Sequence, residues 1–486
     1  MGKGNRDGML SNLPDDILVN ILDRLDVTYA VRTSILSRRW SRLSTKLSRL
    51  TISVLDFLPH NGPIFEIDEV VRSNAAVVEA TTSILAQRDS TRKTIHLLSM
   101  TFFLKDSDHI SIGHAVAKTM ATHKVEMAEF NIMTERDATQ CDDDNLASYG
   151  KKFILFFDAF PDAFGGLTRL HLENLDSVNR TSLMETTMLQ VDHSQLSDLA
   201  IGDCVFAELL LNSVPKLTRL AFEGWISFHY PLSVGDAPLL EAVKLNNVAL
   251  SWHKMVELSK FLCGTSVRDL KLGFKCEKIW VQPQCLTKSL ASVFRQLRFV
   301  NLDEIPEGYD LTWTLFILKA APLLKELYIT VWDHLCKMVT DEEKRKERLF
   351  SEEKGVEWES SASDFHHENL VTLVIFGFQS EKYMVSYIRR VMEAAANLEE
   401  VFLYHRLACR KCLDNSRKQP FKFPWTKRQR LSVKKRITDG IDSFAIIHFP
   451  TTAGIRCQQQ RRTKAAGEVS PAAAEKGDSI FDMVLK

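Results

Sequence analysis

The segment LTRLAF, residues 217–222, carries the pattern that decides the fold: an apolar residue, two variable residues, an apolar residue, one variable residue and a last apolar residue. Side chains that alternate in this way predict a short strand whose fourth and sixth residues point inward. Successive copies of the pattern start 29, 21, 23, 27, 30, 27, 46 and 28 residues apart. The copies start at Leu167, Leu196, Leu217, Leu240, Val267, Leu297, Leu324, Leu370 and Leu398.

Most of these spacings lie at or near the ~20–29-residue period of leucine-rich repeats. Such repeats stack their strands into one parallel sheet, so we expect an α/β solenoid. A proline shortly before three of the strands, at Pro215, Pro238 and Pro322, predicts a turn that ends the preceding helix. The ninth position of a regular unit is Asn or Cys, but here only Cys204 fits. We therefore predict degenerate repeats, over residues 90–340.

The side chains that point outward from these strands form the natural ligand face. Their mixed charge favours a protein substrate over a phosphate-rich ligand. The candidate substrate-binding residues are Arg169, His171, Arg219, Lys244, Lys271, Asn301 and Tyr328. Val374, Phe376, Phe402 and Tyr404 also point outward by register, and we expect the C-terminal segment or a substrate to cover them. The plainer alternative is that most outward residues are only solvated, because few residues carry binding energy.

The N-terminal segment LPDDILVNILDRL, residues 13–25, predicts a helix, since its apolar residues follow helical spacing. Two further short helices fit residues 26–47. Three helices in under forty residues bury too little apolar surface to stand alone, so part of that surface should need a partner. Two alternatives are a helical cap docked on the chain's own repeats and a DNA-reading helix-turn-helix. The third helix lacks the Asn and Gln that often read bases, which disfavours the DNA reading.

This segment closely resembles the plant F-box, in LPDDIL at 13–18, IL at 21–22 and TSILSRRW at 33–40. The resemblance implies a three-helix F-box at residues 8–52 that grips a Skp-type adaptor and, through it, a cullin–RING core. It implies that the adaptor surface includes some of Leu13, Pro14, Ile17, Leu18, Ile21, Leu22, Ile35, Leu36 and Trp40. The others must form the small internal core, and the sequence does not divide the two sets.

Beyond the regular repeats, residues 341–365 read as a charged, mobile insertion, because eleven of the fourteen residues 341–354 are charged. The next segment, with HENLVTLVIFGF at 367–378 and Asn-Leu-Glu at 397–399, resembles the FBD module of plant F-box/leucine-rich-repeat proteins. The resemblance implies an FBD-like cap over residues 366–450. We expect residues 454–486 to be a disordered tail.

Composition excludes several classes of partner. Lys and Arg balance Asp and Glu at 62 each, so no global charge favours nucleic acid or membrane. Nine scattered cysteines favour a reducing compartment, so we expect the nucleus or the cytoplasm. Cys409 and Cys412 form a lone CxxC without a second pair, so we expect no metal and no cofactor. The basic run 427–436 fits an import signal, a phosphate-contacting patch or a solvated helix face.

No catalytic motif occurs in the chain, so we expect a non-enzymatic protein. By the F-box resemblance, its function is that of the substrate-recognition subunit of an SCF-type ubiquitin ligase, whose repeats bind a protein substrate. Two other classes stay open. One is an interaction scaffold that uses the F-box without joining a ligase, and the other is a repeat protein that senses a small ligand.

Overall fold

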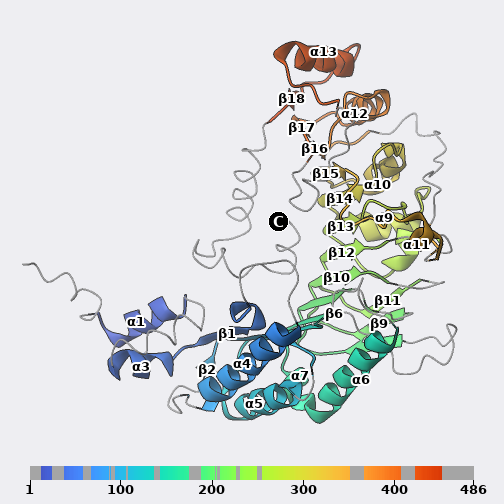
Figure 1. Ribbon diagram of the computed structural model, residues 1–486. Coiled ribbons are helices and arrows are strands. Elements are labelled where there is room, and N and C mark those ends of the chain that lie inside the picture. Colours follow the sequence, from blue (N-terminus) through green and yellow to red (C-terminus); the bar gives the residue numbers. More distant parts are fainter. Residues whose placement is uncertain are drawn as a thin grey trace, which may run out of the picture. The chain divides into compact units, whose positions relative to one another are not determined.

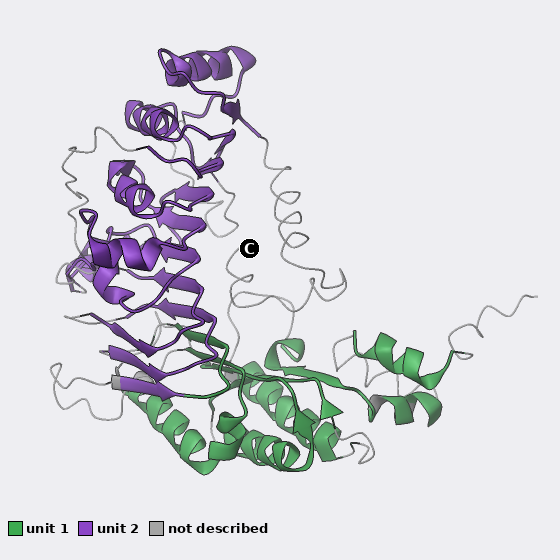
Figure 2. Cartoon of the chain, turned by 180° about the vertical axis from the view of Figure 1, so that it is seen from behind, with its two compact units in different colours: residues 1–185, 193–205, 470–483 green, residues 186–192, 206–469, 484–486 purple. Residues whose placement is uncertain are grey.

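The structure is a computed structural model. It describes residues 13–24, 38–58, 67–86, 88, 94–105, 108–135, 143–173, 188–202, 204, 208–225, 230–248, 254–347, 349–350, 366–406 and 422–450. The chain divides into two compact units, shown in different colours in Figure 2. Among the described residues, unit 1 holds 13–173 and 193–204 and unit 2 holds 188–192 and 208–450, each with the gaps given above.

Unit 1 contains short N-terminal helices followed by alternating strands and helices (Figure 1). Its helices are α1 (Asp15–Leu22), α3 (Arg38–Ser44), η3 (Val54–Asp56), α4 (Ile67–Ala86), α5 (Asp108–Thr122), α6 (Asp143–Ala159) and α7 (Pro161–Gly165). Its strands are β1 (Arg49–Ser53), β2 (Thr94–Ile95), β3 (Leu97–Phe103), β4 (Lys124–Val125), β5 (Ala128–Met133), β6 (Arg169–Glu173) and β8 (Asp198–Gly202). Strands β1, β3, β5, β6 and β8 pair in that order, all in parallel.

The core of unit 1 is rich in phenylalanine. The Phe156 ring of α6 lies 5.8 Å from Phe102 and 5.1 Å from Phe164 between centroids, both edge-on. The parallel sheet starts earlier than the predicted repeat boundary at residue 90. Leu50 and Ile52 of β1 alternate inward and are at most 1% exposed, so the end of the predicted F-box range already belongs to the sheet.

Unit 2 also consists of strands joined by helices and other connecting segments. Its sheet strands are β10 (Arg219–Glu223), β12 (Ala242–Asn246), β13 (Asp269–Gly273), β14 (Phe299–Ile305), β15 (Glu326–Val331), β16 (Thr372–Phe376), β17 (Glu400–Tyr404) and β18 (Ile446–His448). Its helices are α8 (Leu258–Phe261), α9 (Lys288–Phe294), η5 (Leu311–Thr314), α10 (Leu315–Ala320), α11 (Glu342–Glu347), α12 (Lys382–Ala394) and α13 (Lys427–Thr438). The strands pair in chain order and in parallel, and α9, α10 and α12 lie on one side of them (Figure 1).

The predicted inward positions are confirmed in unit 2. One register row holds the fourth residue of each repeat unit, and each side chain in it is at most 1% exposed. The row is Leu220, Val243, Leu270, Val300, Leu327, Leu373 and Val401. Each repeat buries its apolar face only against its neighbours, so this continuous apolar layer couples the stability of adjacent repeats.

We predicted a helix before each of the three proline turns, and this prediction is wrong for two of them. Strands β9 (Glu208–Ser213) and β11 (Leu232–Asp236) precede Pro215 and Pro238, and with β7 (Met188–Asp192) they form a second parallel sheet, in the order β11-β9-β7. The repeat units there start only 21 and 23 residues apart, which leaves little room for a helix. Only Pro322 follows a helix, α10.

Part of the predicted mobile insertion has a defined position. Helix α11 lies within it, and the guanidinium of Arg345 donates to both carboxylate oxygens of Glu277 at 3.0–3.1 Å. Both side chains are nearly buried, at 12% and 5% exposed. Composition alone could not show this anchor, because its partner lies 68 residues away. Residues 351–365 and the predicted tail lie outside the described residues.

The segment predicted as an FBD-like cap continues the sheet of unit 2 through β16, β17 and β18. Gly377, at the end of β16, has φ +76°, and a Cβ there would lie 1.8 Å from the Val331 carbonyl oxygen. A glycine is therefore required for the two strand ends to approach each other. Among the described helices, none has both the length and the apolar character needed to span a bilayer.

Candidate functional site

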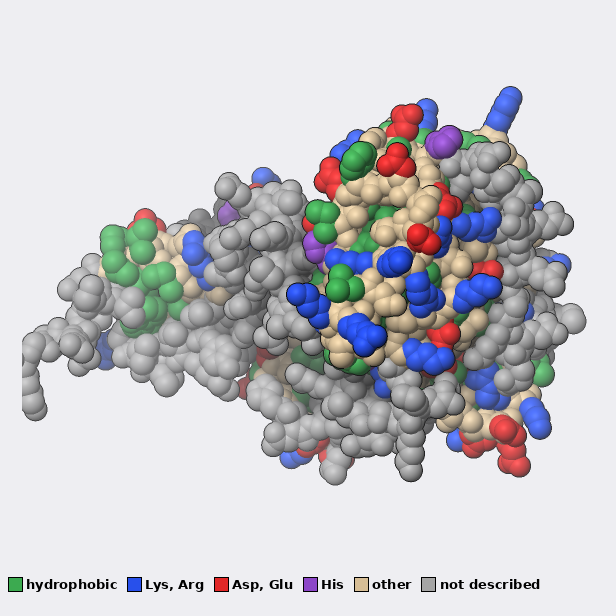
Figure 3. All heavy atoms as spheres, turned by 90° about the horizontal axis from the view of Figure 1, so that it is seen from above, with side chains coloured by type: hydrophobic (Ala, Val, Ile, Leu, Met, Phe, Trp, Pro, Cys, Tyr) green, Lys and Arg blue, Asp and Glu red, His purple; other side chains and the backbone are tan. Residues whose placement is uncertain are grey.

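The first candidate surface is helix α1, whose apolar residues divide between two faces. Leu18, Val19 and Leu22 are buried, at 0–3% exposed. Ile17 and Ile21 lie on the other face and are 45% and 37% exposed. Figure 3 shows apolar side chains gathered over this N-terminal helical part. The helix thus has one apolar face that builds the local core and a second that remains open to solvent.

Polar contacts fix this helix in place. The Asp23 carboxylate, just after α1, accepts hydrogen bonds from the Ser48 amide at 2.8 Å and the Ser48 hydroxyl at 2.6 Å. Arg39 of α3 forms an ion pair with Asp15 at 2.7 Å. These contacts join α1 to α3 and to the start of β1, so the exposed face has a fixed orientation within unit 1.

The structure thereby sorts the predicted adaptor residues. Leu18 and Leu22 belong to the internal core, while Pro14, Ile17 and Ile21 are exposed. Leu13 and Trp40 are half-buried. Ile35 and Leu36 lie outside the described residues.

The second candidate surface is the row of outward residues on the sheet of unit 2, called here the outer row. Neighbouring strands place its members side by side in register. The outer row is Ala221, Lys244, Lys271, Asn301, Tyr328, Val374, Phe402 and His448. It therefore brings together four predicted substrate residues, Lys244, Lys271, Asn301 and Tyr328.

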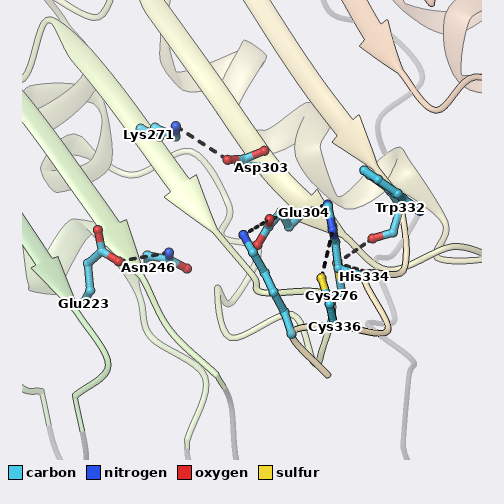
Figure 4. Close-up of polar contacts among 10 residues, drawn as sticks. Glu223, Asn246, Lys271, Cys276, Asp303, Glu304, Trp332, His334 and Cys336 are labelled. Atoms are coloured by element: carbon cyan, nitrogen blue, oxygen red, sulfur yellow. Dashed lines mark hydrogen bonds and ion pairs between the residues drawn. The ribbon is translucent and has the colours of Figure 1, made fainter. Parts of the chain in front are cut away.

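The first half of the outer row is polar but largely buried. Lys244, Lys271 and Asn301 are only 2–8% exposed. Lys244 pairs with Glu223. Lys271 lies 3.5 Å from Asp303 (Figure 4). Burial lowers the pKa of Lys244, although the Glu223 carboxylate partly opposes this. Burial alone would raise the pKa of Glu223, but the Lys244 charge brings it below its ordinary value.

The second half of the outer row is apolar and aromatic. Val374, Phe402 and Tyr404 form a buried cluster against which Tyr328 and Phe376 pack. The rings stack face to face: Phe376 on Tyr404 and Phe402 on His448, each with centroids 4.7 Å apart and planes 18° apart. The expected outward direction is confirmed for these residues. They form a flat platform of rings beside the polar half.

The remaining predicted substrate residues lie apart from this group. Arg169 and His171 belong to unit 1, where Arg169 joins Glu129 at 3.1 Å and the buried Asp198 at 3.3 Å. Arg219 begins β10 and is partly buried. The structure therefore brings only part of the predicted set into one row.

A third polar cluster, at the ends of β13, β14 and β15, was missed by sequence reasoning (Figure 4). Glu304 forms an ion pair with Lys337, and His334 Nε2 lies 3.6 Å from the same carboxylate. Three residues here have left-handed backbone conformations: Lys275 at φ 49°, Cys276 at 61° and Glu304 at 54°. The register of β14 shifts between Leu302 and Ile305, and this bulge directs Glu304 into the cluster.

The cysteine of this cluster is structural. Its Sγ accepts a hydrogen bond from the His334 amide at 3.2 Å and contacts the Trp332 carbonyl. Burial raises the pKa of the Cys276 thiol well above its ordinary range, which makes it a poor nucleophile. Among the described residues, no three His, Cys, Asp or Glu side chains gather as a metal site. Cys409 and Cys412 lie outside the described residues.

We expect His334 to make the fold sensitive to acid. Burial, with the nearby Lys337 charge, lowers the pKa of His334 from 6.5 to about 4. The unfolded chain therefore takes up this proton first as pH falls, so the contribution of His334 to stability decreases between pH 6.5 and 4, by at most about 3 kcal/mol. Urea unfolding from pH 7 to pH 4 would measure this loss in the wild type and in His334→Gln.

The variant should lose less stability over the same range. Glu304, whose pKa burial raises, acts in the opposite sense in both proteins, so their difference isolates the histidine. Equal pH dependence in the two proteins would show that His334 is not held neutral.

Comparisons with known proteins fit this geometry. A family model described as "At1g61320/AtMIF1, LRR domain" matches residues 169–448, and an F-box domain model matches residues 10–51. The chain is 44% identical over 57 residues to Putative F-box/FBD/LRR-repeat protein At5g44950 of Arabidopsis thaliana, and 48% identical over 48 residues to Putative F-box/FBD/LRR-repeat protein At5g22670. These matches cover 12% and 10% of this chain and only 13% and 11% of the two relatives.

Proposed function

The chain belongs to the F-box/leucine-rich-repeat family, and we propose that it is the substrate-recognition subunit of an SCF-type cullin–RING ubiquitin ligase. F-box domains generally bind Skp-type adaptors. The observation that carries the proposal is the open face of α1, where Ile17 and Ile21 stay 45% and 37% exposed although Leu18 and Leu22 are buried. An exposed apolar face beside a fixed helix pair is what a partner protein would cover.

In this role the chain itself performs no chemistry. The F-box would hold the adaptor and its cullin–RING core, and the repeats would hold a substrate protein. Together these two contacts raise the effective concentration of a substrate lysine near the ubiquitin-loaded conjugating enzyme, so ubiquitin transfer becomes effectively intramolecular. F-box/leucine-rich-repeat proteins are typically non-catalytic adaptors, in agreement with this division of labour.

We propose the outer row of unit 2 and its neighbours as the substrate face. The buried Oδ1 atoms of Asn246 and Asn301 find no hydrogen-bond donor within the described part of the chain. A buried acceptor without a donor costs free energy, and a substrate backbone N–H would satisfy it. Tyr328 and Phe376, the partly buried rings at the edge of this platform, would contact an apolar substrate side chain. An extended peptide with alternating polar and apolar contacts fits both halves of the row.

The proposal predicts that the wild-type chain co-purifies with a Skp-type adaptor from cells, and that deletion of residues 11–50 abolishes this. A substrate identified by proximity labelling with the proteasome blocked should then live longer in cells that carry the deletion. A scaffold outside any ligase predicts no change in substrate lifetime. Failure of the wild-type chain to retain the adaptor would count directly against the ligase role.

A further inference from the structure

Helix α13 carries a strongly basic surface that neither the F-box nor the outer row uses. Six of the ten residues 427–436 are basic and none is acidic. In the view of Figure 3, Lys and Arg side chains gather over α13 and its neighbour α12. Only Val433 and Ile437 of α13 are buried, so most of the helix faces solvent.

The basic residues at the start of α13 oppose the electrostatics of the helix. Lys427 and Arg428 lie in the first turn, where the positive end of the helix dipole disfavours cations. The helix begins instead with a capping box, in which the Thr426 side chain accepts from the Gln429 amide at 3.2 Å and Gln429 bonds back to the Thr426 amide at 2.9 Å. Helix formation therefore does not explain why cations occupy these positions.

Two arginines attach α13 to the rest of unit 2. Arg389 of α12 donates to the carbonyls of Arg436 and Ile437 at 3.0 Å, and Arg436 donates to the Ser380 carbonyl at 3.1 Å. A third, Arg430, donates to the Pro424 carbonyl at 3.0 Å. These contacts fix the helix and leave the other four cations for a different purpose.

The four remaining cations surround a single leucine. Leu431 is 58% exposed, and Lys427, Arg428, Lys434 and Lys435 lie three or four residues from it, hence on the same side of the helix. None of the four forms an ion pair within the described residues. We call these five residues the α13 surface.

We propose that the α13 surface binds an acidic protein segment that carries an apolar side chain to cover Leu431. The cations would pair with carboxylates at the rim, and the leucine would supply the apolar centre that protein interfaces prefer. Nucleic acid fits less well, because phosphates would leave Leu431 uncovered and the chain as a whole has no net charge. A membrane fits less well, because one exposed leucine gives little apolar area for insertion.

Fluorescence anisotropy with the full-length chain would test this. The probe is a labelled 15-residue glutamate peptide with leucine at every fourth position, at low salt. We expect it to bind about tenfold more tightly than the same peptide with alanine in place of leucine. Leu431→Ser should remove that difference. Charge reversal in Lys427→Glu/Lys435→Glu should weaken binding about tenfold.

The matched control is Arg295→Glu/Lys325→Glu, which makes the same charge change at two exposed positions of unit 2 away from α13. It should bind the peptide as the wild type does. Equal weakening by both reversals, no binding of the leucine peptide, or tighter binding of oligo-dT or phosphatidylserine vesicles would each overturn the inference. Adaptor co-purification should be unchanged in every variant, so this result is separable from the proposed ligase role.

Discussion

Ile17→Asp combined with Ile21→Asp is expected to lower the affinity for a Skp-type adaptor by at least about 100-fold. Fully burying an isoleucine stabilises an interface by about 1.5–3 kcal/mol, so covering the 45% of Ile17 and 37% of Ile21 that are exposed contributes about 1–2.5 kcal/mol together. About 1.4 kcal/mol corresponds to a factor of ten in affinity. A carboxylate in an apolar contact adds a further cost of desolvation. Calorimetry with the purified adaptor would measure the loss. Because both side chains are partly exposed in the free chain, the urea unfolding midpoint should change far less than the adaptor affinity.

Ile154→Asp is the matched control for this pair. Ile154 lies on α6 of the same unit and is 45% exposed, the same as Ile17. Its substitution introduces one carboxylate, half the charge change of the double variant, at an isoleucine outside the F-box that is as exposed as Ile17, so adaptor affinity should be unchanged. A similar loss in the control would mean that general surface charge governs the binding. Full affinity in the double variant would remove the basis of the proposed function.

The repeats were predictable because their signal is local. Each strand carries its own alternation, so inward positions such as Leu220 and Leu270 follow from six residues of sequence, and parallel register then aligns them. The division of α1 was not predictable in the same way. The apolar residues at 17, 18, 21 and 22 form a stripe too wide for one packing partner to cover. Only the position of that partner decides that Leu18 is buried and Ile17 is exposed.

The polar sites were harder to predict because they depend on neighbours from other repeats. Lys244 was predicted as a substrate-binding residue on the outward face, but it is 2% exposed and pairs with Glu223 of the adjacent strand. The Glu304 cluster depends on a bulge in β14, where the alternation of FVNLDEI breaks at Asp303 and Glu304. Two adjacent polar residues are equally typical of the end of a strand, so the sequence alone does not identify a bulge there.

Gly377→Ala is expected to destabilise unit 2 by about 4 kcal/mol or more. A left-handed conformation costs a non-glycine residue about 1–2 kcal/mol. At φ +76°, the new Cβ would also lie 1.8 Å from the Val331 carbonyl oxygen, so β15 and the end of β16 would have to separate. Losses of this size are exceptional for one methyl group and mark a close backbone approach. Hydrogen exchange of peptides that cover 326–331 and 372–376 would report the local loss of protection.

Gly440→Ala separates the two contributions. Gly440 has φ +73°, nearly the same as Gly377, but no atom lies within 4 Å of the position its Cβ would take. This variant should therefore show only the conformational cost of about 1–2 kcal/mol, without loss of exchange protection in β15 and β16. The difference between the two variants measures the steric contact with Val331. If both variants cost the same, the two strand ends do not meet at Gly377, and the sheet does not continue through this segment as described.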